Sequence, residues 1–293
     1  MRIRRKTRDT RVVPARIGTT LVTLALGILA SFQATARPQP CQSTTFENAR
    51  FTVCRYTAAR DDLMLVSHSP RGPIGSLSKL ETSLGARAVA VDFAMNAGMY
   101  DEARRPVGLF VESFRTIHPL NRSDGTGNFF LKPNGVFWLD AVGVPHVEET
   151  ESFAVRHPPA KLATQSGPLL VRSGRLNPRI ADDGPSLTLR NGVGVRGGQA
   201  VFVISDDPVS FGRFARFIRD GLGMTDALYF DGAVSVCGYR RWIGRTRETA
   251  WQRLSWRLAA EPPRPNPIVN LIRAILRPRL DARRPFRLYR ALL

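Results

Sequence analysis

The chain has 293 residues, of which 43% are hydrophobic and 23% are charged, a composition typical of a globular protein with a sizeable core. Its net charge of +19 is concentrated at the ends, because residues 1–16 carry +6 and residues 257–293 carry +7. Only +6 remains for the residues between them, and the sequence contains no nucleic-acid-binding motif with interleaved aromatic side chains. We therefore expect no nucleic-acid partner.

Residues 1–36 have the pattern of a secretory signal peptide. Seven basic residues within 1–16 precede an apolar run over 17–32, and this run leads into Ala34-Thr35-Ala36. We therefore expect a periplasmic or secreted protein. An uncleaved membrane anchor is the alternative, although the run is short for a membrane span.

Three cysteines, Cys41, Cys54 and Cys237, allow three different single disulfides. An exported protein folds in an oxidising compartment, which favours one disulfide, and Cys41 with Cys54 is the local pairing. Three free thiols are the alternative.

A strand–helix–strand unit is expected over residues 63–94. The apolar run 63–67 precedes a segment of helical spacing over 76–84, which ends at Gly85, and a second apolar run follows over 86–94. Beyond it, short apolar or aromatic runs separated by turn signals predict β-strands over 106–112, 128–131, 135–140, 168–171 and 192–195. Pro133-Asn134-Gly135 and Gly197-Gly198 predict hairpin-type turns.

A second strand–helix–strand unit is expected over residues 200–230. Its helix is capped by Ser210 and closed by Gly221 and Gly223, and apolar runs flank it at 200–205 and 227–230. A strand that returns through a helix is most simply a right-handed parallel crossover. We therefore predict a single α/β or α+β domain over residues 40–256, with a mixed β-sheet core that contains two such units.

Residues 257–293 are expected to form a basic, proline-rich tail. Four prolines between 262 and 267 predict a stiff linker, and residues 268–276 have the spacing of one short helix. Such a tail is typically disordered or loosely docked, and contact with an anionic membrane surface is the alternative.

Polar residues gather where the predicted strands end. The second strand of each unit runs into such a loop, the first containing Asn96 and Gly98 and the second beginning with Asp231. In α/β sheets, ligands bind beyond the carboxyl ends of strands, so Asn96 and Asp231 are candidates for one shared site. For any one of these loops, a glycine needed only for the turn is the alternative explanation.

Several of these residues suit a substrate that carries a phosphate. Arg190 offers a bidentate guanidinium, and amides near Asn191-Gly192 and Ser166-Gly167 could donate beside it. Lys132 is a candidate second cation, with a solvated turn residue as the alternative. Asp231 and Glu112 are the carboxylates near strand ends that could act as a general acid, a general base or a nucleophile. The four histidines are scattered singly, so we predict no metal and no cofactor.

The order of seven motifs resembles the phosphodiester glycosidase family, which includes N-acetylglucosamine-1-phosphodiester alpha-N-acetylglucosaminidase. The motifs are AMNAGMY, PVGLFVE, GNFFLKPNGVF, ATQSGPLLV, RNGVGV, VFVIS and ALYFDGAVS, and the likeness covers roughly residues 51–239. The likeness is greatest to the family's exported bacterial branch. It implies hydrolysis of a sugar-1-phosphodiester to free sugar and a phosphomonoester, and a role in envelope or exopolysaccharide metabolism would suit an exported enzyme.

The resemblance implies a set of site residues by motif. They are Asn96, Gly98, Asn128, Gln165, Ser166, Arg190, Asn191, Asp231, Gly232 and Ser235. We expect Arg190, helped by Lys132, to bind the phosphate, Asp231 to act as base or nucleophile, and Asn96, Asn128 and Gln165 to orient the sugar. Ala233-Val234 stands where the family's better-known member has glycines, so the loop's geometry, and with it the substrate, need not follow that member.

Two alternatives to a hydrolase stay open. One is a periplasmic module that binds a phosphorylated glycan without cutting it. The other is a structural envelope protein anchored by its basic ends.

Overall fold

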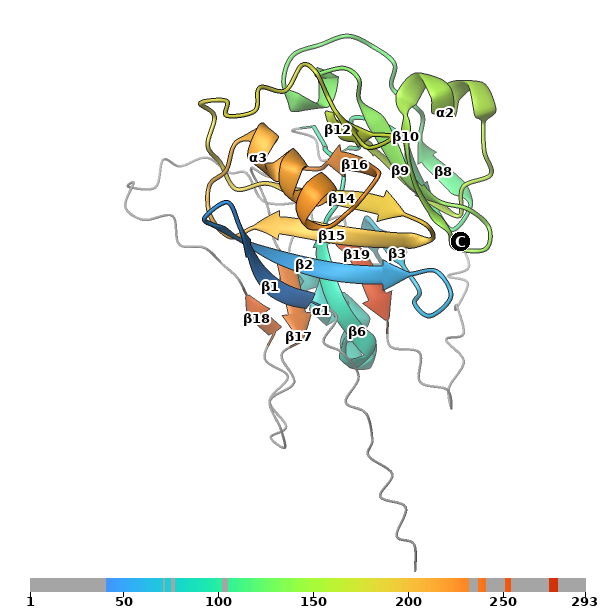
Figure 1. Ribbon diagram of the computed structural model, residues 1–293. Coiled ribbons are helices and arrows are strands. Elements are labelled where there is room, and N and C mark those ends of the chain that lie inside the picture. Colours follow the sequence, from blue (N-terminus) through green and yellow to red (C-terminus); the bar gives the residue numbers. More distant parts are fainter. Residues whose placement is uncertain are drawn as a thin grey trace, which may run out of the picture. The chain divides into compact units, whose positions relative to one another are not determined.

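Three antiparallel β-sheets form most of the structure, with few helices (Figure 1). The computed structural model describes residues 41–70, 72–74, 77–101, 105–231, 237–240, 251–253 and 274–278. All of these lie in one compact unit, Gln39–Leu293. The predicted signal peptide lies outside the described residues. Among them, no helix has the length and apolarity to cross a bilayer.

The first sheet has seven strands. In sheet order they are β1 (Cys41–Phe46), β2 (Ala49–Thr57), β15 (Gln199–Ser205), β14 (Asn191–Arg196), β16 (Asp226–Tyr229), β12 (Leu169–Arg172) and β13 (Arg175–Leu176). The second sheet has the order β10 (Pro145–Glu149), β9 (Gly135–Leu139), β11 (Leu162–Ser166), β7 (Phe110–Glu112) and β8 (Arg115–His118).

The third sheet has the order β18 (Trp251–Arg253), β17 (Cys237–Arg240), β6 (Val91–Asn96), β19 (Ala274–Pro278) and β3 (Met64–Val66). A small hairpin, β4 (His68–Ser69) with β5 (Gly72–Pro73), follows β3. The short helices are α1 (Leu77–Leu84), η1 (Gly85–Ala90), η2 (Asn128–Phe130), α2 (Thr150–Arg156), α3 (Phe211–Arg216) and η3 (Phe217–Gly221).

The inner faces of the three sheets share one apolar core. Phe202 of β15 lies at its centre, with ring centroids 5.5 Å from Phe93 of β6 and 5.6 Å from Phe137 of β9. Because side chains alternate along a strand, Val201 and Val203 point to the opposite face of β15. The continuous apolar run of β15 thus lets one strand contribute to two cores.

Each outer face is covered by one helix. On the first sheet, Phe214 and Phe217 of the α3–η3 segment pack against Phe51, whose ring stacks 4.0 Å from that of Phe217. On the second sheet, Phe153 of α2 packs edge-on against Trp138, and on the third, α1 packs on β6. Figure 1 shows α3 beside β14 and β15, and α2 beside β9 and β10. Helix and sheet therefore alternate as layers around the shared core.

The predicted strand–helix–strand units are present in chain order but are not confirmed as parallel crossovers. Strand β19 lies between β3 and β6, and β14 lies between β15 and β16, in each case antiparallel to both neighbours. Every pairing between the described strands is antiparallel, so the expected mixed sheet is wrong for this part of the chain. The inserted strand forms hydrogen bonds with the backbone N–H and C=O groups on one edge of each neighbouring strand. A helical crossover alone would leave these groups without partners.

Local signals gave mixed results. The Ser210 cap is confirmed, because its side chain accepts a hydrogen bond from the Arg213 amide, and the Gly197-Gly198 hairpin is confirmed between β14 and β15. The strand predicted over 128–131 is wrong, since η2 occupies it. The helix predicted over 268–276 is wrong at its described residues, 274–276, because β19 begins at Ala274 and pairs with both β3 and β6.

The disulfide prediction is confirmed. Cys41 and Cys54 are bonded, lie directly opposite each other on β1 and β2, and are both buried. The bond closes the hairpin at the start of the described unit.

Removing this disulfide is expected to lower the free energy of unfolding by about 3 kcal/mol, because cross-linking a loop of this size restricts the unfolded chain. Urea unfolding of the variant carrying Cys41→Ala and Cys54→Ala measures the loss. Ser43→Ala, an exposed change on the same strand, is the control and should be near neutral. Reductant should lower the stability of the wild type and leave the double variant unchanged, and equal sensitivity of both proteins would contradict the prediction.

Candidate active site

Strand ends from all three sheets meet at one place. Strand β6 ends at Asn96, β11 ends at Ser166, β14 begins at Asn191, and β16 leads directly into Phe230 and Asp231. Ser166 Oγ donates to the Phe230 carbonyl at 3.4 Å, and the Phe230 amide donates to the Asn191 carbonyl at 3.0 Å. The three-sheet packing therefore gathers residues that are far apart in the sequence.

Two buried asparagines hold this junction together. Asn96 Nδ2 donates to the Asp231 carbonyl at 2.9 Å, and Asn191 Nδ2 donates to Asn96 Oδ1 at 2.9 Å. Asn96 is 3% exposed and Asn191 is fully buried. The expected meeting of Asn96 with Asp231 is thus found, while the chemical roles of both residues stay predictions.

The predicted site glycines stand where backbones approach too closely for a side chain. A Cβ on Gly98 would lie 2.4 Å from the Gln165 carbonyl oxygen, and one on Gly192 would lie 2.5 Å from that of Leu228. A Cβ on Gly167 would lie 2.5 Å from the Phe129 carbonyl oxygen and 3.1 Å from that of Asn128. These glycines permit the convergence of strands and loops, which is a packing role. Gly232 and Ser235 lie outside the described residues.

Gln165 has a different role from the expected one. Its Oε1 accepts from the amides of Leu109 and Asn121, and its Nε2 donates to the Asn121 carbonyl and to Thr150 Oγ1. A primary amide offers two acceptor positions and two donors, so Gln165 has none left to orient a sugar. It holds the 107–121 segment against β11.

Glu112 and Lys132 are also engaged elsewhere. Glu112 Oε1 accepts from the Ser67 amide at 2.7 Å. Lys132 Nζ forms an ion pair with Asp124 at 2.6 Å and donates to the Arg122 carbonyl. Among the described residues, no contact joins either side chain to the asparagine pair, so neither strengthens the expected site.

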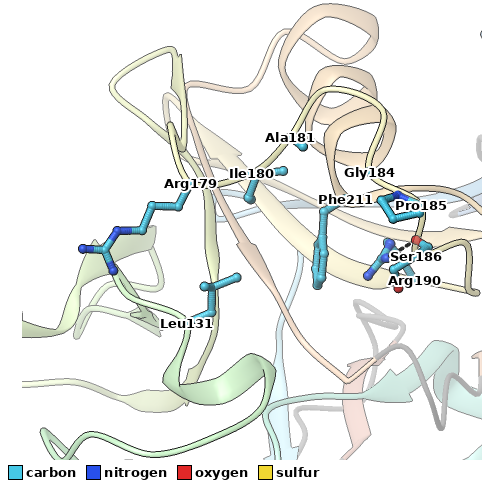
Figure 2. A pocket seen from close by; sticks show the side chains of 9 residues that line it. All are labelled: Leu131, Arg179, Ile180, Ala181, Gly184, Pro185, Ser186, Arg190 and Phe211. Atoms are coloured by element: carbon cyan, nitrogen blue, oxygen red, sulfur yellow. Dashed lines mark hydrogen bonds between the residues drawn. The ribbon is translucent and has the colours of Figure 1, made fainter.

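Arg190 lies in a pocket of its own, a cavity of about 120 Å³ next to α3 (Figure 2). Its Nε donates to the Val209 carbonyl and its Nη2 to the Ser186 carbonyl, each at 2.8 Å. The guanidinium lies 3.5 Å from the centroid of the Phe211 ring. Figure 2 shows Phe211 and Arg190 on one side of the cavity and Leu131 and Arg179 on the other.

The charge of Arg190 lacks a carboxylate partner within the described part of the chain. The side chain is only 1% exposed, and this burial lowers the pKa of the guanidinium, against an opposing effect of Tyr229. Buried charges are normally paired, so carbonyl dipoles, the rings of Phe211 and Tyr229 and a side-chain hydrogen bond with Tyr229 must stabilise this one in the absence of an anion. Such an arrangement favours binding of an anion in the adjacent cavity.

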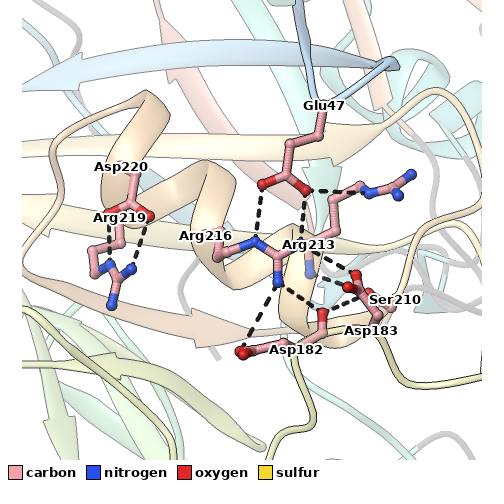
Figure 3. A network of polar contacts seen from close by, with 8 residues as sticks. All are labelled: Glu47, Asp182, Asp183, Ser210, Arg213, Arg216, Arg219 and Asp220. Atoms are coloured by element: carbon pink, nitrogen blue, oxygen red, sulfur yellow. Dashed lines mark hydrogen bonds and ion pairs between the residues drawn. The ribbon is translucent and has the colours of Figure 1, made fainter.

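One wall of the cavity is a loop, residues 180–186, which an ionic network holds against α3 (Figure 3). Arg216 donates to the Asp182 carbonyl at 2.7 Å and pairs with Asp183 at 3.3 Å. The same guanidinium binds both oxygens of Glu47, in the β1–β2 turn, at 2.9 and 2.7 Å. Glu47 thus orients the arginine that holds the cavity loop.

A family model described as phosphodiester glycosidase matches residues 90–253, more than half of the chain. The chain belongs to the phosphodiester glycosidase family. This match confirms the resemblance seen in the motifs. It covers the asparagine pair, Arg190 and Asp231, so the site described above lies within the family's domain.

Two individual proteins show the extent of the likeness. Uncharacterized protein YigE of Escherichia coli (strain K12) is 37% identical over 164 residues, which are 55% of this chain and 63% of YigE. The match therefore spans less than two thirds of that relative. The catalytic domain of zebrafish N-acetylglucosamine-1-phosphodiester alpha-N-acetylglucosaminidase, auto-inhibited by its pro-peptide, aligns with a TM-score of 0.47 and 14% identity, covering 82% of this chain and 81% of that one.

Some residues around the site of this phosphodiester glycosidase-family chain were not predicted. Thr164 Oγ1 accepts from the Gly98 amide at 3.2 Å, and Ser186 and Phe211 surround the Arg190 guanidinium. Thr164 adjoins the predicted Gln165, so its position beside that residue was a usable signal. Ser186 and Phe211 carry no such signal, because only the fold brings them to Arg190.

The ion pair of Glu47 predicts a pH dependence of stability. The hydrogen bond from Arg216 holds the pKa of Glu47 below its usual value of 4.5. A lowered pKa means that the stabilisation is complete above about pH 4.5 and is lost as the pH falls through the folded-state value. The stability difference between the wild type and Glu47→Gln should therefore shrink between about pH 7 and pH 3.

Urea unfolding at a series of pH values measures this difference. Glu81→Gln is the matched control, because Glu81 forms no ion pair among the described residues. The stability difference between the wild type and Glu81→Gln should change little with pH. A Glu47→Gln difference that stays constant over the series would show that the carboxylate does not stabilise the fold through its charge.

Proposed function

We propose that this chain is an exported hydrolase that cleaves a sugar-1-phosphodiester into free sugar and a phosphomonoester. Family membership supports the reaction class. The observation that carries the proposal is the buried guanidinium of Arg190, which has no carboxylate partner in the described part of the chain and lines a cavity next to α3. An anionic phosphate is the group that such a cation would bind.

The proposed reaction does not require a strong general acid. A phosphomonoester has a second pKa of about 6, so it leaves more readily than a sugar alcohol does. What remains is to stabilise charge on the departing phosphate and to activate water or attack the anomeric carbon directly. We assign the phosphate to Arg190 and the attack or proton transfer to Asp231, whose position the Asn96 hydrogen bond to its carbonyl supports.

Export is part of the proposal. The signal-like pattern of residues 1–36 predicts it, and the Cys41–Cys54 disulfide supports it, because such bonds persist in oxidising compartments. The substrate would then be a phosphorylated glycan or sugar phosphate of the envelope or of exopolysaccharide metabolism. Basic residues near the carboxyl terminus would add contact with an anionic membrane surface.

Turnover tests the proposal. The purified full chain, incubated with a panel of sugar-1-phosphodiesters, should release reducing sugar, and Asp231→Asn should lower kcat by at least about 100-fold, the usual contribution of a proton-transfer or nucleophilic carboxylate. Asp220→Asn is the matched control, since Asp220 pairs only with its neighbour Arg219 in an exposed ion pair, and it should leave kcat unchanged. Substrate that binds to the wild type without any release of sugar would indicate a binding module instead.

Competition with inorganic phosphate tests the role of Arg190. Arg190→Lys keeps the charge but loses the planar, bidentate donor geometry, so inhibition by phosphate should weaken about tenfold and KM should rise. Circular dichroism and a melting curve check the fold, because Arg190 also binds the Val209 and Ser186 carbonyls. Equal inhibition of a folded variant and the wild type would remove Arg190 from the phosphate site.

A further inference from the structure

The asparagine junction contains a buried acceptor without a donor. Asn191 is fully buried, and among the described residues its Oδ1 has no hydrogen-bond partner. It is the one buried side-chain oxygen of this kind within the described part of the chain. Buried polar atoms are nearly always paired, and leaving an acceptor unsatisfied costs free energy.

The surrounding contacts determine which end of the Asn191 amide is unpaired. The carbonyl of Asp231 can only accept, so Asn96 must point its Nδ2 toward it and its Oδ1 toward Asn191. Asn191 must then donate to that oxygen, which leaves its own Oδ1 free. Reversing the Asn191 amide would place two acceptor oxygens 2.9 Å apart, the distance now spanned by the hydrogen bond.

Other buried amides in the fold do not share this feature. Gln165 satisfies all four of its positions with protein groups. Asn177 donates to the Leu169 carbonyl at 2.8 Å and accepts from the Arg179 amide at 3.0 Å. The fold thus supplies backbone partners to amides that only hold loops, and leaves one oxygen unused where the strand ends of all three sheets converge.

We propose that Asn191 is a specificity residue whose Oδ1 accepts a hydrogen bond from a neutral donor on the sugar, either a hydroxyl or an acetamido N–H. This inference rests on the proposed function. Asn96 positions the Asn191 amide, and through its second hydrogen bond it couples that position to the backbone of Asp231.

Substrate analogues test the proposal together with Asn191→Leu, which keeps the size of the side chain and removes its amide. The analogues lack, one at a time, each ring hydroxyl and the acetamido N–H. For the wild type, kcat/KM should fall at least about tenfold for one analogue, because a site that loses its hydrogen bond rejects the analogue. For Asn191→Leu, kcat/KM for the parent substrate should fall to the value for that analogue, so that the variant no longer distinguishes the two.

Asn177→Leu is the matched control, because it makes the same change at a buried amide whose partners are all in the protein. In Asn177→Leu, the ratio of kcat/KM for the parent substrate to kcat/KM for the analogue should be the same as in the wild type. If Asn191→Leu does not fold, Asn191→Ser replaces it, and the wild-type analogue series decides independently. The proposal is overturned if no analogue lowers the wild-type kcat/KM by more than about threefold, or if the same loss of kcat/KM is still seen in the Asn191 variant. Either result would assign Asn191 Oδ1 to an internal water.

Failure of the proposed function can be told apart from failure of this inference. If the wild type releases no sugar from any substrate, the hydrolase proposal fails. Calorimetric binding of the free sugars and their analogues then tests Asn191 alone. Selective loss of affinity for one analogue, abolished in the Asn191 variant, supports the inference. Equal affinities, or no binding to any of the sugars, overturn it.

Discussion

The contact of three phenylalanine rings is the interaction on which the arrangement depends. Phe202 touches Phe93 and Phe137, and each ring comes from a different sheet. Because the inner faces are packed around these rings, the strands approach one another closely enough for their ends to meet. The junction of Asn96, Asn191 and Asp231 is a consequence of this packing, since no two of its members are neighbours in the sequence.

Two electrostatically different regions lie on opposite faces of the first sheet. On one, the side-chain amides of Asn96 and Asn191 form a network with the Asp231 carbonyl, and among the described residues Asn191 Oδ1 has no hydrogen-bond partner. On the other, a buried guanidinium is stabilised by carbonyl dipoles and aromatic faces rather than by a carboxylate. The Glu47–Arg216 pair acts at a distance, by holding the loop that closes the charged side.

Residue-type signals predicted local features that depend on few neighbours. The Ser210 cap, the Gly197-Gly198 hairpin and the Cys41–Cys54 disulfide all follow from short-range chemistry, and all are found. The partners of Gln165 and Lys132 were out of reach of the same reasoning. A polar side chain near a strand end binds either substrate or its own loop, and only the position of that loop decides which.

The sequence alone determined the family and the set of polar strand ends, because these depend on residue identity and spacing. Tertiary structure decided how the strands are paired. Insertion of β14 and β19 between strands that look like simple crossover partners depends on which backbone edges remain open, and that is a property of the assembled sheets. It also decided that Asn191 keeps one oxygen free, since the direction of its amide follows from a carbonyl forty residues away.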